Sequence, residues 1–303
     1  ARESFENYLK SGNLQADVIL LNEQFLTPEL LEKGNLIILG STATGFPSVD
    51  KYQTASSLCS AVLSHMSGWQ PSGAVHGNGG KSNVIVCFSP ELRLKSTLAL
   101  WLARMSSDHL YISLEAFPAF CLQNETGGKN LSDIFYHIKA LKGNLTIALE
   151  SLVCNGNGIS YIPPMDNSGD LWELTDKETG ILAETLLSWG RFSNIVVDLE
   201  FNTSPRTLQW LEMASCVIVP FTAAYPEPIL RMKSKHSYLP GAGTDKYRWV
   251  LAGEGHTAGL KDQFETLYWL PWLEALPQRF GTLSLEMHAF GQLKALLAGQ
   301  RQP

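Results

Sequence analysis

The sequence lacks the features that would assign it to several specialised classes. Its five cysteines form no C-x-x-C pair, and its seven histidines show no metal-binding spacing. We therefore expect no disulfide framework and no zinc site, and interpret the cysteines as reduced, buried thiols. No apolar run approaches the roughly 18 residues of a membrane-spanning helix, and the first residues contain no apolar signal core. The expected location is the cytoplasm.

Positive charge is also in deficit. The chain has 23 Lys and Arg against 29 Asp and Glu, a formal net charge of −6. Proteins that bind nucleic acid normally carry a basic excess, so we expect no nucleic-acid partner. The alternative of a DNA-binding partition protein rests only on Arg231–His236 with Lys246 and Arg248, which we interpret as a solvated face.

What the sequence does contain is an alternation of strand and helix patterns. Apolar runs of strand length alternate with amphipathic segments, which predicts an α/β fold with mostly parallel sheets. We predict a first domain over residues 1–67, a glycine-rich linker over 68–83 and a second domain over 84–303. The expected strands are Asp17–Asn22, Leu36–Leu39, Val84–Phe88, Leu110–Leu114, Ile159–Ile162, Asn194–Asp198, Cys216–Val219, Tyr247–Leu251 and Thr266–Leu270, and the expected helices include Thr54–Met66, Lys95–Met105, Leu131–Lys142, Asp176–Ser188, Pro205–Met213 and Phe290–Ala298.

Two segments have the Lys-Ser pair of a phosphate-binding loop. The first, Gly79–Ser82, precedes a strand instead of following one, and Val75 stands where the first glycine is needed. Such a loop must follow a strand and begin a helix, so that its N–H groups converge on phosphate. We interpret this segment as linker.

The second segment lies in the right context, between a strand and an apolar helix. Lys95 would reach the outer phosphates, and the Ser96 hydroxyl would reach magnesium, with Thr97 beside them. However, the loop contains no glycine, and Glu91 would repel phosphate. From these residues alone, a helix N-terminus with a polar start is favoured over a nucleotide site.

Two carboxylates follow predicted strands. Glu115 comes directly after one strand and Asp198 ends another. Open α/β sheets bind ligands outside the carboxyl ends of their strands, so both belong near Lys95. The candidate nucleotide site is therefore degenerate: it comprises Lys95, Ser96, Thr97, Glu115 and Asp198, with Ser96 and Asp198 as magnesium ligands only if nucleotide binds.

The order of these elements resembles the ParA/MinD deviant Walker-type ATPases. That family reads K-G-G-V-G-K-[ST]-T after its first strand, then has a strand ending D-x-D and another ending in Asp. Here Lys95-Ser96-Thr97, Glu115 and Asp198 match, but Ser113 replaces the first acid and Pro90 the signature lysine. The resemblance implies a doubly wound P-loop NTPase fold, a homodimer, and either no cofactor or ATP with magnesium at low affinity.

The first domain resembles the back half of a response-regulator receiver domain. The phosphoacceptor position falls on Asn22, which cannot accept a phosphoryl group; Ser41 or Thr42 falls near the family's hydroxyl and Lys51 near its lysine. A receiver-like domain ahead of a MinD-like domain is the architecture of the TadZ/CpaE pilus-assembly proteins.

The TadZ/CpaE resemblance implies a scaffold in Flp/tad-type pilus assembly or polar positioning. Its partners would be pilus or secretion-machinery proteins, in the bacterial cytoplasm at the inner face of the membrane or the cell pole. A pseudo-ATPase without catalytic residues is the favoured reading, and a weakly hydrolysing dimerisation switch is the alternative. We interpret the apolar segment Met287–Leu297 as packing on the second domain instead of contacting a bilayer.

Overall fold

The structure is a computed structural model that separates into two compact units. It describes residues 18–26, 36–40, 46–67, 81–120, 128–140, 144–234, 238–241, 244–253, 259–273 and 287–299. The first unit comprises Ala1–Val75 and Ala140–Leu152, and the second comprises His76–Lys139 and Val153–Pro303. Ser41, Thr42 and most of the predicted linker lie outside the described residues.

The first unit is built on a parallel sheet. Strands β1 (Ile19–Asn22), β2 (Leu36–Leu39) and β3 (Ser48–Val49) pair in that order. Helix α3 (Ala55–Ser67) buries Val62 in a cluster with residues of β2 and β3. Helix α6 (Leu145–Leu152), which the sequence pattern did not predict, packs against α3. The receiver-like identity of this unit stays a prediction.

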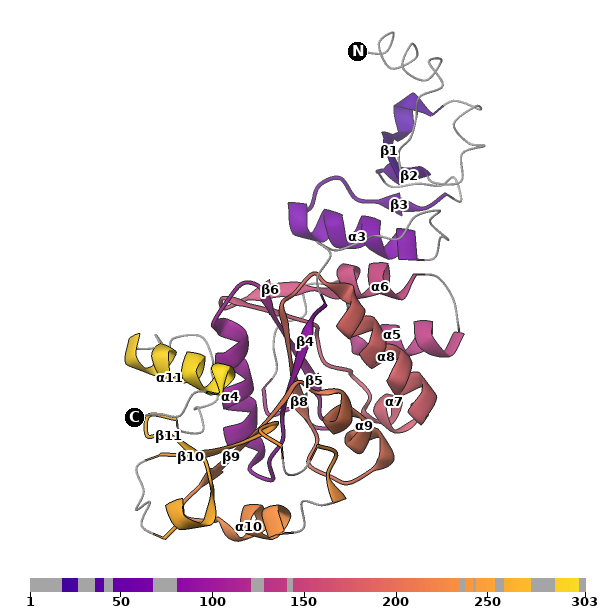
Figure 1. The fold of residues 1–303 in the computed structure, drawn as a ribbon. Helices are drawn as coiled ribbons and strands as arrows, with labels where there is room; N and C mark the ends of the chain where they lie inside the picture. The colour runs from indigo at the N-terminus through magenta and orange to yellow at the C-terminus, as the bar shows by residue number, and fades with distance from the viewer. Residues whose placement is uncertain are drawn as a thin grey trace. The chain divides into compact units, whose positions relative to one another are not determined.

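The second unit contains the large sheet (Figure 1). Its described strands lie in the order β11-β10-β9-β4-β8-β5-β7-β6, and every neighbouring pair is parallel except β6 with β7. The predicted α/β class with a mostly parallel sheet is confirmed. The strands are β4 (Asn83–Cys87), β5 (His109–Leu114), β6 (Cys154–Gly156), β7 (Ile159–Tyr161), β8 (Asn194–Leu199), β9 (Cys216–Thr222), β10 (Tyr247–Ala252) and β11 (Leu267–Leu270).

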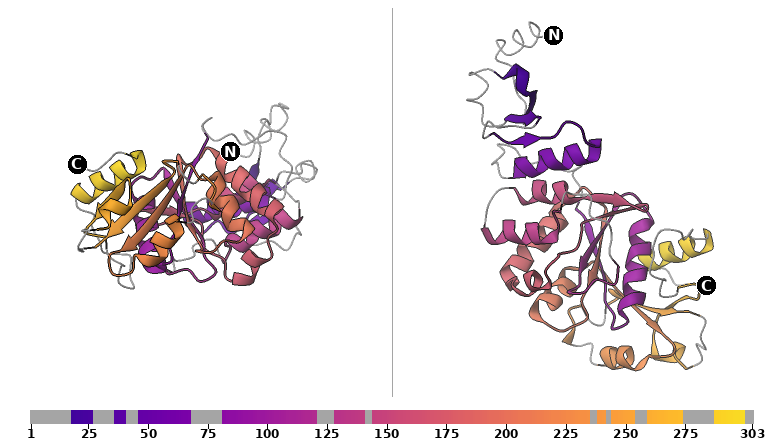
Figure 2. Two further views of the ribbon diagram at one scale, coloured as in Figure 1. Left: turned by 60° about the horizontal axis from the view of Figure 1, so that its bottom comes forward. Right: turned by 180° about the vertical axis from the view of Figure 1, so that it is seen from behind.

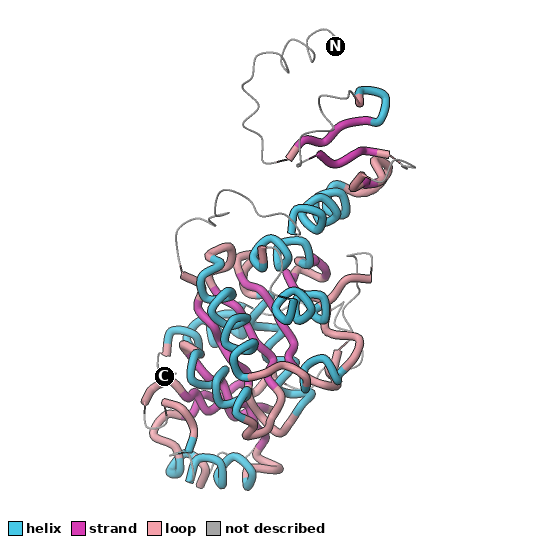
Figure 3. Tube along the Cα trace, turned by 90° about the vertical axis from the view of Figure 1, so that its right-hand side faces the viewer, coloured by secondary structure: helices cyan, strands magenta, loops and turns pink. Residues whose placement is uncertain are grey.

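Helices cover both faces of this sheet, as a doubly wound fold requires (Figure 2). Helices α4 (Leu92–Arg104) and α11 (Met287–Ala298) lie on one face, and α5 (Leu131–Ala140), α8 (Asp176–Trp189) and α9 (Pro205–Met213) lie on the other. Because both faces are covered, the central strands contain continuous buried apolar runs instead of an alternating pattern. The remaining short helices are α7 (Ser168–Trp172), α10 (Glu227–Ser234) and the 3-10 turns η1 (Glu23–Phe25) and η3 (Lys261–Gln263), and helices and strands can be told apart by colour in Figure 3.

Two details correct the sequence analysis, and a third agrees with it. Helix α4 begins at Leu92, earlier than the predicted Lys95. Cys59 is exposed, whereas Cys87, Cys154 and Cys216 are buried; all four are free thiols. Helix α11 buries Leu293 and Leu296 in the core of the second unit, which is the packing expected of it. No helix among the described residues is both long enough and apolar enough to cross a membrane.

Candidate functional site

The connection between β4 and α4 is too short and too helical to wrap a phosphate. Strand β4 ends at Cys87 and α4 begins at Leu92, so four residues join them. No residue from 89 to 95 has a positive φ. A phosphate loop relies on glycines to turn successive N–H groups inward, whereas leucine in the left-handed region costs about 1–2 kcal/mol. Without glycine, residues 92–94 instead form the first turn of the helix.

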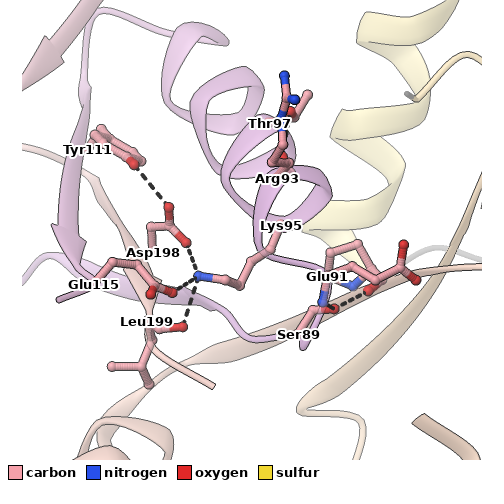
Figure 4. Close-up of polar contacts among 10 residues, drawn as sticks. Ser89, Glu91, Arg93, Lys95, Thr97, Tyr111, Glu115, Asp198 and Leu199 are labelled. Carbon is pink, nitrogen blue, oxygen red and sulfur yellow. Dashed lines mark hydrogen bonds and ion pairs between the residues drawn. The ribbon is translucent and has the colours of Figure 1, made fainter. Parts of the chain in front are cut away.

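The polar groups of this connection are bonded to one another (Figure 4). The Ser89 hydroxyl donates to the Pro220 carbonyl at 2.6 Å and accepts from the Glu91 N–H at 3.1 Å. The Leu92 N–H lies 3.1 Å from the Pro90 carbonyl. These N–H groups are therefore not available to an anion.

The Glu91 carboxylate does not face the candidate phosphate position as an unpaired charge. Its Oε1 accepts from the Thr222 N–H at 2.7 Å and from the Thr222 hydroxyl at 3.2 Å. Thr222 is the last residue of β9, so this contact ties the start of α4 to the neighbouring strand. The expected repulsion of phosphate by Glu91 is thus replaced by a structural role.

Lys95 is the centre of a buried polar cluster. Its fully buried ammonium contacts Glu115 Oε1 and Asp198 Oδ1 and donates to the Leu199 carbonyl at 3.0 Å (Figure 4). The Tyr111 hydroxyl donates to the other oxygen of Asp198 at 3.0 Å. An ammonium has three N–H donors, and three acceptors surround this one. We call Lys95, Tyr111, Glu115 and Asp198 the lysine cluster.

Burial and neighbouring charges together shift the pKa values of the lysine cluster. Burial lowers the pKa of Lys95, but Asp198 and Glu115 more than offset this, so the pKa lies above its ordinary value. Burial raises the pKa of Glu115, and Lys95 only partly counteracts that rise. Burial, followed by the charge of Asp198, raises the pKa of Tyr111 well above its ordinary value. Lys95 therefore stays a cation and Tyr111 a neutral hydrogen-bond donor at neutral pH.

The structure brings together three of the five predicted site residues. Lys95, Glu115 and Asp198 meet, as expected from their positions at the carboxyl ends of the strands. The Thr97 hydroxyl instead donates to the Arg93 carbonyl of its own helix at 2.7 Å, and Figure 4 shows both residues away from the lysine cluster. The Ser96 hydroxyl is buried and has no hydrogen-bond partner among the described residues.

The residues of the candidate nucleotide site are not arranged to bind magnesium and ATP. Lys95 already binds one oxygen of each carboxylate that a metal would need, and no residue from 89 to 95 has the positive φ that lets a phosphate-binding loop turn its N–H groups inward. Across the described part of the chain, no group of three or more His, Cys, Asp and Glu side chains is arranged to hold a metal. The buried Ser96 hydroxyl, which has no hydrogen-bond partner among the described residues, is a feature of this site that would suit an ion.

Tyr111, Ser89 and Thr222 are site residues that the sequence analysis missed. Tyr111 carries a polar group in a strand that is buried along its whole length, which is a usable signal because a buried hydroxyl normally needs a partner. Its strand position pairs with Val196, two residues before Asp198. Thr222 lies far along the chain from Glu91, and nothing local in the sequence indicates that contact.

No protein-family model and no curated protein matches the sequence. Among solved structures, the chain is similar to a plasmid partition protein from Borrelia burgdorferi bound to AMPPNP, with 14% identity, 72% of this chain and 98% of that chain covered, and a TM-score of 0.44. It is also similar to the cell division ATPase MinD from Pyrococcus furiosus (11% identity, 72% and 98% covered, TM-score 0.44). A third similar structure is cobyrinic acid a,c-diamide synthase from Mycobacterium smegmatis with a bound ATP analogue and magnesium. The sequence identity is 14%, the match covers 72% of this chain and 93% of that chain, and the TM-score is 0.46.

Proposed function

We propose that this chain is a ParA/MinD-type protein that has lost ATP hydrolysis and acts as a localisation or assembly scaffold. The observation that supports the proposal is the lysine cluster, in which Lys95 is bound by Glu115 and Asp198. The helical turn at residues 92–94, where a phosphate loop would lie, points the same way. Both changes remove nucleotide chemistry while leaving the sheet intact.

The resemblance to TadZ/CpaE suggests where such a scaffold works. We place it in Flp/tad-type pilus assembly or polar positioning, with pilus or secretion-machinery partners, in the bacterial cytoplasm at the inner face of the membrane or the pole. Asn22 ends β1 and its side chain accepts from the Gln24 N–H at 3.3 Å, as the cap of a 3-10 turn. A capping role for Asn22 agrees with a receiver-like unit that is not phosphorylated.

Titration with labelled ATP and magnesium tests the loss of nucleotide chemistry. We expect a dissociation constant no tighter than high micromolar, and hydrolysis at the background rate. Ser96→Ala is a suitable matched variant, because the Ser96 hydroxyl has no partner among the described residues and its loss should not affect folding. A low-micromolar constant that is lost in both Lys95→Ala and Ser96→Ala would overturn the proposal.

That overturning result would establish the alternative, an ATP-dependent dimerisation switch. The orphaned Ser96 hydroxyl is the specific observation in its favour. In this reading, nucleotide binding must first release Lys95 from Asp198 and Glu115. Binding would then be slow and strongly dependent on the lysine cluster, and stopped-flow fluorescence would detect the release step.

We also propose a homodimer that forms through an aromatic groove of the second unit. The groove has a volume of about 780 Å³ and is lined by Phe88, Phe201, Leu208, Tyr225, Met232 and Tyr238 among others. Tyr225 is 60% and Tyr238 82% exposed, and both line the same groove, so they contribute to one contiguous apolar surface of the kind that marks interaction sites. Aromatic residues and methionine are enriched in protein interfaces.

Light scattering at micromolar concentration tests the homodimer. We expect twice the 33.4 kDa mass of the chain, and a return to the monomer mass in a Tyr225→Ser, Tyr238→Ser double variant. A wild-type mass of one chain, with and without ATP, would contradict the proposal.

A further inference from the structure

The large sheet has a second cavity at the opposite end from the lysine cluster. It has a volume of about 820 Å³ and lies where β4, β8 and β9 begin, with α11 beside it. The first residues of these strands, Asn83, Asn194 and Cys216, line it together with Ser215. Pockets for cofactor-sized ligands have volumes of about 300–1,000 Å³. We call this space the basal cavity.

The described lining of the basal cavity combines apolar side chains with polar and positively charged ones. It includes Arg248 and Lys294 but, among the described residues, no Asp or Glu, in a chain whose net charge is −6. The nearest acidic residue along the chain is Asp108, next to the lining residue His109, and its carboxylate already accepts from the Ser193 N–H at 3.1 Å. The described lining residues therefore carry a positive formal charge.

The two cations of the basal cavity form no ion pair with a carboxylate in the part of the chain that the structure describes. Arg248 donates to the Leu296 carbonyl at the end of α11, and its buried Nε has no hydrogen-bond partner among the described residues. The Lys294 ammonium lies 5.0 Å from the centre of the Phe290 ring, and no described carboxylate forms an ion pair with it. Guanidinium and ammonium groups in this state are complementary to carboxylate or phosphate.

Gly291 is one of the residues that line the basal cavity. It lies inside α11, where glycine is unfavourable relative to alanine. A Cβ built at Gly291 meets nothing within 4 Å, so no close packing explains the glycine. Since Gly291 lines the cavity, a side chain there would instead occupy the space beside Lys294.

We propose that the basal cavity binds a small organic anion, a phosphate monoester with an apolar part. Its phosphate would contact Arg248 and Lys294, while the apolar part would lie against Ile85, Met105 and Leu297. The basal cavity is separate from the candidate nucleotide site, because the parallel strands place their amino and carboxyl ends at opposite edges of the sheet. It also goes beyond the scaffold proposal and does not depend on it.

Isothermal titration with glycerol 3-phosphate, AMP and, as a neutral probe, glycerol tests the proposal. We expect one or both phosphate esters to bind and glycerol not to bind. Lys294→Gln should weaken binding by about tenfold or more, because a hydrogen bond to a charged group is lost. The matched control is Lys177→Gln, which removes an exposed lysine from α8 and should leave the affinity unchanged.

A second pair of variants separates filling of the cavity from loss of charge. Gly291→Leu should abolish binding without unfolding the protein, because its side chain points into open space, while Gly291→Ala should retain most of the affinity. Vesicles of phosphatidylglycerol, compared with phosphatidylcholine, distinguish a lipid headgroup from a soluble ester. No heat with either ester or phosphatidylglycerol at millimolar concentration, or equal affinity in wild type and Gly291→Leu, would overturn the proposal.

Discussion

The two ends of the large sheet differ in whether their charged side chains are paired. At the carboxyl ends of the strands, Lys95 binds both Glu115 and Asp198. At the amino ends, Arg248 and Lys294 line an open cavity whose described lining contains no acidic residue. A buried polar group is costly unless it is paired. The paired lysine cluster therefore stabilises the fold and has few hydrogen-bonding groups left to bind a ligand. The cations of the basal cavity remain available to bind one.

Glycine accounts for much of this contrast. The β4–α4 connection has no glycine, and the helix begins only four residues after the strand, which leaves a short loop. Helix α11 has a glycine at position 291 in the lining of the basal cavity, where a Cβ would meet nothing within 4 Å. The two sites thus differ in whether the backbone leaves room for a ligand as well as in charge.

The largest expected effect comes from removing the cation of the lysine cluster. Lys95→Met should lower the free energy of unfolding by about 3–5 kcal/mol, because it leaves two carboxylates buried without their partner. Urea denaturation measures this loss. Lys139→Met is the control: Lys139 binds Glu173 at 2.6 Å on the surface, and exposed pairs contribute only about 0–1 kcal/mol.

A triple variant shows whether charge or packing causes the loss. Adding Glu115→Gln and Asp198→Asn to Lys95→Met removes the uncompensated charges and should restore much of the stability. If Lys95→Met were no more damaging than Lys139→Met, the lysine cluster would not be the structural element described here.

Removing the tyrosine of the lysine cluster should have a smaller effect. Tyr111→Phe deletes the hydrogen bond to Asp198 and should cost about 1.5–3 kcal/mol. The loss should be seen in urea denaturation at pH 7, with unchanged secondary structure by circular dichroism.

The same variant should change the response to alkaline pH. The pKa values of Tyr111 and Lys95 are higher in the folded protein than their ordinary values of about 10 and 10.4. The stabilisation from such groups is complete below the ordinary pKa and is lost as pH rises through the folded one. The free energy of unfolding should therefore fall above about pH 10, and less steeply in Tyr111→Phe. Equal slopes for the two proteins would contradict this assignment.

The sequence predicted the lysine cluster better than the connection beside it. Asp198 and Glu115 follow apolar strands, and parallel strands align their carboxyl ends, so their meeting with Lys95 follows from local pattern and topology. The start of α4 was predicted too late because Leu92 and Leu94 were assigned to a loop by analogy with a phosphate-binding motif, although leucine favours helix.

Contacts distant along the chain were beyond prediction. Thr222 reaches Glu91 because β9 is the neighbour of β4, and strand order cannot be read from one sequence. The basal cavity likewise combines Asn83, Asn194, Arg248 and Lys294, which share no motif. The helix α6 was missed because its apolar pattern is short, and its packing partner α3 lies in an earlier segment of the chain.

A moderate effect is expected at the start of α4. Glu91→Ala should cost about 0.5–1.5 kcal/mol, because the Thr222 N–H and hydroxyl lose their acceptor at a half-buried position. Glu91→Gln keeps the acceptor oxygen and should cost less. Thermal denaturation of the two variants measures the difference, and equal losses would assign the effect to the charge of Glu91 instead of its hydrogen bonds.

The smallest expected effect is a gain of stability at the basal cavity. Gly291→Ala should raise the free energy of unfolding by up to about 1 kcal/mol, because alanine is the better helix former and its methyl group meets no neighbour. Gly190→Ala is the contrasting control: Gly190 ends α8 with φ of 68°, so alanine there should cost about 1–2 kcal/mol. Thermal denaturation of both variants without added anion measures the two opposite signs. A loss of stability in Gly291→Ala would mean that the space beside Lys294 is filled in the folded protein, and the basal cavity would then not be open to a ligand.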